Sequence, residues 1–145
     1  MKKLDERAQA DLSSLRDRVL LSLQFMDEAE DLGPLADQIR RTVESTCAKQ
    51  DLRAMRLIAR DVDALTNALP PYQRDGLEAL LNRRLGVDKD AERLEASRHV
   101  AALLQRGTIQ SEKERRRLEE YVEMLETTGG DPAEVDAVRR LLSGR

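Results

Sequence analysis

Apolar residues recur every three or four positions along almost the whole chain, and this spacing constrains the fold more than any other feature. Such a period places them on one side of an α-helix, whereas a half-buried strand would need strict alternation. Only 2% of the residues are aromatic and 37% are charged, a composition that favours amphipathic helices over sheets. The sequence therefore predicts an all-α fold, a single-domain bundle of six or seven antiparallel-packed helices over residues 1–145.

Glycine, proline and capping residues divide this pattern into segments. The expected helices cover residues 3–31, 72–85, 88–106, 111–128 and 131–142, with one or two more between 35 and 69. We favour a break near residues 48–51 with Asp51 as the N-cap, because an uninterrupted helix would place this carboxylate within its apolar stripe. Ser111 with Glu114, and Asp131 with Glu134, have the spacing of reciprocal capping boxes. In the helix expected over 88–106, the apolar positions are Ala91, Leu94, Val100, Ala101 and Leu104.

The long N-terminal helix has apolar residues on two opposite faces. One stripe consists of Leu12, Leu15, Val19, Leu23 and Met26. Leu21, Phe25 and Leu32 lie almost opposite to it. Such a helix is either the central element of the bundle or uses its second face to meet another chain. Because an uncovered apolar patch marks an interaction site, Leu21, Phe25 and Leu32 are the candidate interaction residues.

The basic run at residues 113–117 raises the question of nucleic-acid binding. It contains Lys113, Arg115, Arg116 and Arg117, but on a helix these charges spread around more than one full turn. Acids outnumber bases between residues 111 and 145. Binding to phosphates needs a positive local potential, so this segment argues against a nucleic-acid partner.

Residues 80–97 resemble a helix-turn-helix motif, with Gly86 at the turn. The resemblance departs from its pattern at Asn82, where a small residue is usual, and at Glu92 and Glu95, which occupy inward positions. Acidic residues open the second helix and would meet DNA phosphates with like charge. A DNA-binding regulator with a degenerate motif at 80–97 is therefore kept only as an alternative.

The chain offers little equipment for catalysis. His99 is the only histidine, and Glu95 one turn earlier indicates a surface pair. Cys47, the only cysteine, continues an apolar stripe and indicates a small buried residue. Zinc and di-iron sites need more histidine or cysteine ligands, so we expect no metal, no cofactor and no catalytic residue. A carboxylate-based, magnesium-dependent helical enzyme is the remaining catalytic alternative.

These observations leave surfaces as the basis of function. We expect a non-enzymatic adaptor or regulator that binds another protein, itself as a homodimer, or both. No apolar run approaches the roughly 20 residues of a membrane span. The first residues lack the apolar core of a secretory signal, and the single cysteine fits a reducing compartment, so the expected location is cytoplasmic.

Overall fold

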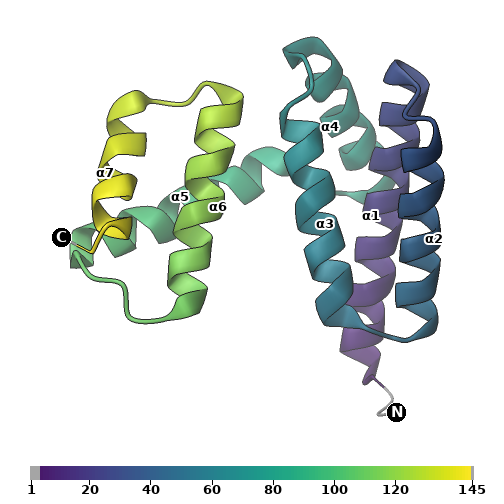
Figure 1. Ribbon diagram of the computed structural model, residues 1–145, viewed down its shortest axis with the longest axis horizontal. Coiled ribbons are helices and arrows are strands. Elements are labelled where there is room, and N and C mark those ends of the chain that lie inside the picture. Colours follow the sequence, from purple (N-terminus) through teal and green to yellow (C-terminus); the bar gives the residue numbers. More distant parts are fainter. Residues whose placement is uncertain (1–3, 145) are drawn as a thin grey trace. The chain divides into compact units, whose positions relative to one another are not determined.

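The computed structural model describes residues 4–144, which form seven α-helices and no strand, with 83% of these residues helical. The all-α class predicted from the sequence is thus confirmed (Figure 1). In chain order, the helices are α1 (Glu6–Glu30), α2 (Pro34–Ala48), α3 (Leu52–Asn67), α4 (Pro71–Leu85), α5 (Lys89–Arg106), α6 (Glu112–Thr128) and α7 (Pro132–Leu142).

The chain divides into two compact units, Met1–Val87 and Asp88–Arg145. Each unit has an apolar core of its own, whereas the sequence predicts one domain. No linker separates the units. Val87 packs against the first core, and the next residue, Asp88, is already the N-cap of α5, where its carboxylate accepts a hydrogen bond from the Ala91 N–H at 3.0 Å.

In the first unit, α1 is the central helix, and α2, α3 and α4 all pack against it. Figure 1 shows α1, α2 and α3 side by side, with successive helices running in opposite directions. The core lies between them, with Leu23 and Met55 completely buried. Arg18 of α1 also forms an ion pair with Asp63 of α3 at 3.1 Å. The central position of α1 requires both of its apolar faces to be covered.

The ends of these helices follow local chemistry. The predicted break between α2 and α3 is confirmed, because Gln50 adopts a positive φ of 52° and the Asp51 carboxylate accepts a hydrogen bond from the Ala54 N–H at 3.0 Å. α1 ends at Glu30, within one residue of the predicted end at residue 31. Asp31 adopts the left-handed conformation at φ 50°, and the Leu32 N–H bonds to the side chain of Asp27 at 2.8 Å. Gly33 and Pro34 instead begin α2.

In the second unit, α6 and α7 form a hairpin, and α5 runs across them rather than alongside (Figure 1). This crossing changes which residues of α5 are buried. Val100 and Leu103 enter the core, whereas Leu94, which the sequence places at a core position, is 53% exposed. The core is completed by residues of α6 and α7, namely Leu118, Tyr121, Val122, Leu125 and Val138.

Both predicted capping boxes form only in part. Ser111 Oγ accepts a hydrogen bond from the Glu114 N–H at 3.2 Å, and the Asp131 carboxylate accepts one from the Ala133 N–H at 3.0 Å. The glutamates make other contacts. The Glu114 carboxylate accepts from the Gln110 N–H at 2.8 Å, and that of Glu134 accepts from the Tyr121 hydroxyl. Each glutamate thereby joins its helix to a neighbouring segment.

Candidate functional site

The three predicted interaction residues lie against the core of the first unit. Leu21, Phe25 and Leu32 are each partly buried and pack against the cluster formed by α1, α2, α3 and α4. Phe25 lies close to Gly76 of α4, because a Cβ atom at Gly76 would be in ordinary van der Waals contact with Phe25 Cζ at 3.6 Å. The second face of α1 is therefore largely covered within the same chain. A role for these residues in binding stays a prediction.

A more exposed apolar surface lies on the outer side of α3. Leu57 and Leu65 are 42% and 45% exposed, and residues eight apart lie on the same side of a helix. Three exposed arginines, Arg53, Arg56 and Arg60, are spaced three and four residues apart beside Leu57. We name Arg53, Arg56, Leu57 and Arg60 the arginine face. Our interpretation of the sequence missed it, although the arginine spacing at 53, 56 and 60 could have revealed it.

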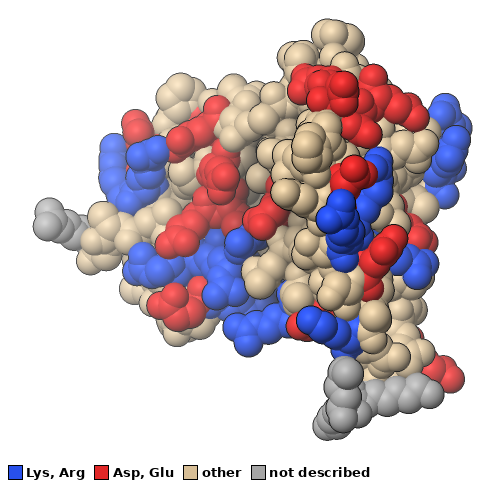
Figure 2. All heavy atoms as spheres, turned by 45° about the vertical axis from the view of Figure 1, so that its right-hand side comes forward, with Lys and Arg blue, Asp and Glu red and all other residues tan. Residues whose placement is uncertain are grey.

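The basic run on α6 does not form a binding surface of its own. Arg115 is half-buried and donates a hydrogen bond to the backbone carbonyl of Leu142 at 3.0 Å. Lys113, Arg116 and Arg117 are exposed. Figure 2 shows acidic and basic side chains interspersed on the face that it presents, rather than one continuous basic patch.

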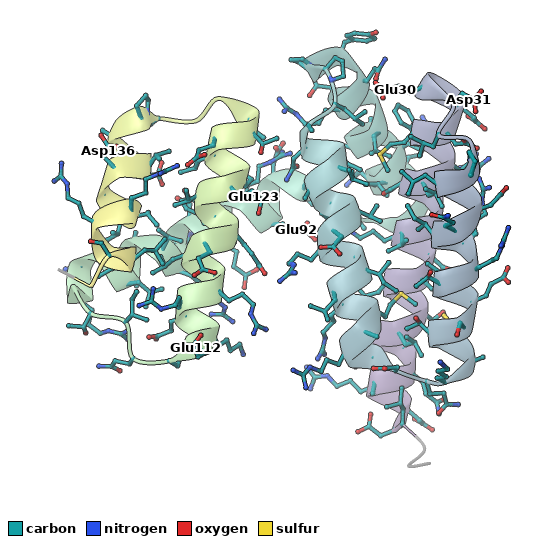
Figure 3. The ribbon with its side chains drawn as sticks, viewed as in Figure 1. Glu30, Asp31, Glu92, Glu112, Glu123 and Asp136 are labelled. Atoms are coloured by element: carbon teal, nitrogen blue, oxygen red, sulfur yellow. The ribbon has the colours of Figure 1, made fainter. Side chains whose placement is uncertain are left out.

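The second half of α6 carries exposed acids instead. Glu119, Glu123 and Glu126 follow one another at spacings of four and three on one side of the helix, and we name them the glutamate face. In Figure 3, the labelled Glu112 lies at the beginning of α6 and the labelled Glu123 lies further along the same helix. Glu126 forms an ion pair with Arg139 of α7.

A polar cluster joins the three helices of the second unit. The hydroxyl of the buried Tyr121 on α6 donates to the Glu134 carboxylate on α7, and Ser97 on α5 also influences the pKa of this hydroxyl. Burial is the main cause that raises the pKa of Tyr121. The bond to Glu134 raises the pKa further, and Ser97 opposes this rise. The cluster fixes how α5, α6 and α7 meet in the core.

Replacing Tyr121 by phenylalanine is expected to lower the free energy of unfolding of the second unit by about 1.5 kcal/mol, because a hydrogen bond to a charged group is lost. A raised pKa stabilises the folded unit below pH about 10, where an unfolded tyrosine ionises. This stabilisation is lost as the pH rises through the pKa of the folded state. Urea unfolding at neutral and alkaline pH measures both effects.

The control is Tyr72→Phe, because Tyr72 is 74% exposed and should change stability by less than about 0.5 kcal/mol. An alkaline loss of stability equally steep in Tyr121→Phe and in the unmodified protein would assign the titration to another group.

The connection between α5 and α6 is held by a second polar contact. Arg106 donates to both carboxylate oxygens of Glu114, at 3.1 and 2.5 Å, and also to the Thr108 carbonyl at 2.7 Å. The hydrogen bond from Arg106 is the main reason that the pKa of Glu114 is lowered. This pairing orders the connection but brings no further reactive group to it.

The remaining candidates for chemistry are dispersed. Cys47 is half-buried against the first core, and desolvation by burial is the main cause of the raised pKa of its thiol. His99 is exposed on α5, as its sequence context indicates. Within residues 4–144, the side chains of His, Cys, Asp and Glu nowhere gather in a group of three or more that could hold a metal ion.

The stretch that resembles a helix-turn-helix spans the boundary between the two units. Leu81 at its beginning belongs to the first core, whereas the helix that follows contributes Val100 and Leu103 to the second. Its two halves thus serve different cores. Among the described residues, every helix is too short or too polar to cross a lipid bilayer.

Comparison of the chain with protein-family models, with curated proteins and with solved structures found no match. The exposed surfaces of the protein are therefore the basis of the proposed function.

Proposed function

We propose that this protein is a helical interaction module, an adaptor or regulator without enzymatic activity, which binds protein chains and associates with itself. The observation that supports this most directly is the outer side of α3, where Leu57 and Leu65 remain exposed together on one helix. Isolated exposed leucines are ordinary on protein surfaces. Here Leu57 lies beside three exposed arginines, and Leu65 is exposed two turns further along the same helix, so α3 offers a more specific surface for an interaction than an isolated leucine does.

The apolar part of this surface is small. Completely burying a leucine side chain contributes about 1.5–3 kcal/mol, and these two are already partly shielded from water. Contact through the leucines alone is therefore weak, and a stable complex needs further attraction from the neighbouring charges. The association is therefore expected to be reversible. Its simplest form is a self-complementary dimer.

Sedimentation velocity of the full chain over a range of concentrations tests the proposal. We expect a concentration-dependent shift from monomer to dimer, which Leu57→Glu plus Leu65→Glu weakens without unfolding the protein. The matched control is Leu35→Glu plus Leu94→Glu, at residues that are 45% and 53% exposed on other helices. A chain that stays monomeric at every concentration overturns self-association, and equal loss in both variants overturns the assignment to α3.

A further inference from the structure

We propose that the dimer forms by contact between the arginine face of α3 in one copy and the glutamate face of α6 in the other. The inference rests on the self-association proposed above and names the surfaces that carry it. Each copy supplies both faces, so the same contact is made twice in an isologous pair.

The positive charges of the arginine face are unfavourable for the stability of α3. The positive end of the helix dipole lies at the N-terminus, and after the N-cap Asp51 the first turn of α3 contains Arg53 and no acid. Arginines three and four residues apart also repel one another. Within residues 4–144, Arg53 and Arg56 form no ion pair. Arg60 lies 3.7 Å from its exposed neighbour Asp61. Ion pairing within the described residues thus gives no reason for Arg53 and Arg56.

The glutamate face has the opposite character. The negative end of the helix dipole lies at the C-terminus, and the last turn of α6 contains no base, although it includes Glu126. Glu119 and Glu123 are like charges four residues apart, and neither forms an ion pair within the part of the chain that the structure describes. Arg53 and Arg56 on one face, and Glu119 and Glu123 on the other, are therefore like charges that a face of opposite charge would stabilise.

The spacings of the two faces match when the helices run antiparallel. Counted from the N-terminus, the arginines follow at intervals of three and four, and the glutamates counted from the C-terminus follow at the same intervals. This register places Arg53 opposite Glu126, Arg56 opposite Glu123 and Arg60 opposite Glu119. Both triplets extend about 10.5 Å along their helices. The antiparallel arrangement also brings the positive end of one helix dipole to the negative end of the other.

Leu57 lies among the arginines and becomes covered in this contact. Exposed ion pairs each contribute little and are screened by salt, whereas burial of Leu57 strengthens them by excluding water. The dimer should therefore weaken markedly between about 0.1 M and 1 M salt, over which the screening length falls from about 10 Å to about 3 Å.

Two charge-reversed variants test the contact. Each variant has the charges of one face reversed, and the two are studied separately and then mixed. The first variant carries Arg56→Glu with Arg60→Glu, and the second carries Glu119→Arg with Glu123→Arg. All four side chains are exposed, so both variants should keep the helical circular dichroism of the unmodified protein. Each reversal places like charges at both contacts of the dimer and should raise the dimer dissociation constant by about tenfold or more.

The equimolar mixture of the two variants is the decisive sample. The acidic α3 of the first variant then meets the basic α6 of the second, and the unmodified α3 of the second meets the unmodified α6 of the first. We expect the mixture to form a heterodimer with an affinity near that of the unmodified protein. Matched controls at other exposed positions, Arg41→Glu with Arg98→Glu and Glu44→Arg with Glu95→Arg, should leave the dimer intact.

The outcomes separate this inference from the proposed function. If the unmodified chain dimerises and both reversed variants dimerise equally well, self-association stands and the assigned contact is wrong. If the variants are monomeric but mixing restores no dimer, the pairing of α3 with α6 between copies is wrong. If the unmodified chain never dimerises, self-association itself fails.

Discussion

The double substitution Leu21→Glu plus Phe25→Glu is expected to unfold the first unit. Both side chains pack against the core, and Phe25 lies close to Gly76 on α4. Two carboxylates at these positions would lose apolar burial and would be partly withdrawn from water without a cation beside them. We expect a combined loss of about 4 kcal/mol or more, a large part of the 5–15 kcal/mol that stabilises a typical domain.

Thermal and urea unfolding followed by circular dichroism measures this loss. The control is Leu57→Glu plus Leu65→Glu, which makes the same chemical change on the outer side of α3 and should cost less than about 1 kcal/mol. A double variant on α1 that remains folded with an unchanged midpoint would show that Leu21 and Phe25 are not needed by the core. They would then be available as the interaction surface that the sequence predicts.

Replacement of Leu118 by alanine is expected to destabilise the second unit by about 2–5 kcal/mol. This side chain is completely buried among α5, α6 and α7, and its removal leaves a cavity as well as lost apolar contact. The counterpart in the first unit is Met55→Ala, at a residue that is equally buried. Because the two residues belong to different cores, each substitution should lower the stability of its own unit.

Hydrogen exchange resolved by residue distinguishes the two units in one experiment. Leu118→Ala should accelerate exchange in α5, α6 and α7, and Met55→Ala should do so in α1, α2 and α3. If either substitution accelerates exchange equally in all seven helices, the chain unfolds as the one cooperative domain that its sequence predicts.

The helix boundaries could be predicted from the sequence because they depend on local chemistry. Asp51 starts α3, and Gly86 and Gly107 end α4 and α5, because each position needs a capping carboxylate or a left-handed backbone that few residues supply. The end of α1 was predicted to within one residue, but the residue that ends it was not. Asp31 takes the left-handed conformation before Gly33 is reached, and Asp27 compensates by bonding the next backbone N–H.

Burial was harder to predict because it depends on how helices cross. The sequence predicts a core position for Leu94 of α5 and not for Leu103, yet the crossing over α6 and α7 exposes the first and buries the second. Phe25 likewise lies close to Gly76 on α4, 51 residues later in the chain. The spacing of apolar residues within one helix predicts neither the crossing of α5 nor the position of α4 beside Phe25.

The candidate site could be predicted only in its general nature. The absence of a plausible catalytic motif directed attention to surfaces, but apolar periodicity selected Leu21, Phe25 and Leu32 on α1. The structure leaves Leu57 and Leu65 on α3 more accessible to a partner. The dense basic run 113–117 is the more obvious charge feature of the sequence, but its charges spread around the helix. The wider spacing of Arg53, Arg56 and Arg60 places three positive side chains on one side of a helix.

The junction at Val87 and Asp88 has a consequence for how this chain can be altered. Val87 closes the end of α4 through a backbone bond to Leu81 at 3.3 Å, and Asp88 opens α5. Because the last residue of one unit and the first of the next both stabilise a helix end, deletion of either residue would remove one of these contacts. The two units thus follow one another in the chain without a linker residue, and exchanging either unit for a foreign one requires Val87 to be kept with α4 and Asp88 with α5.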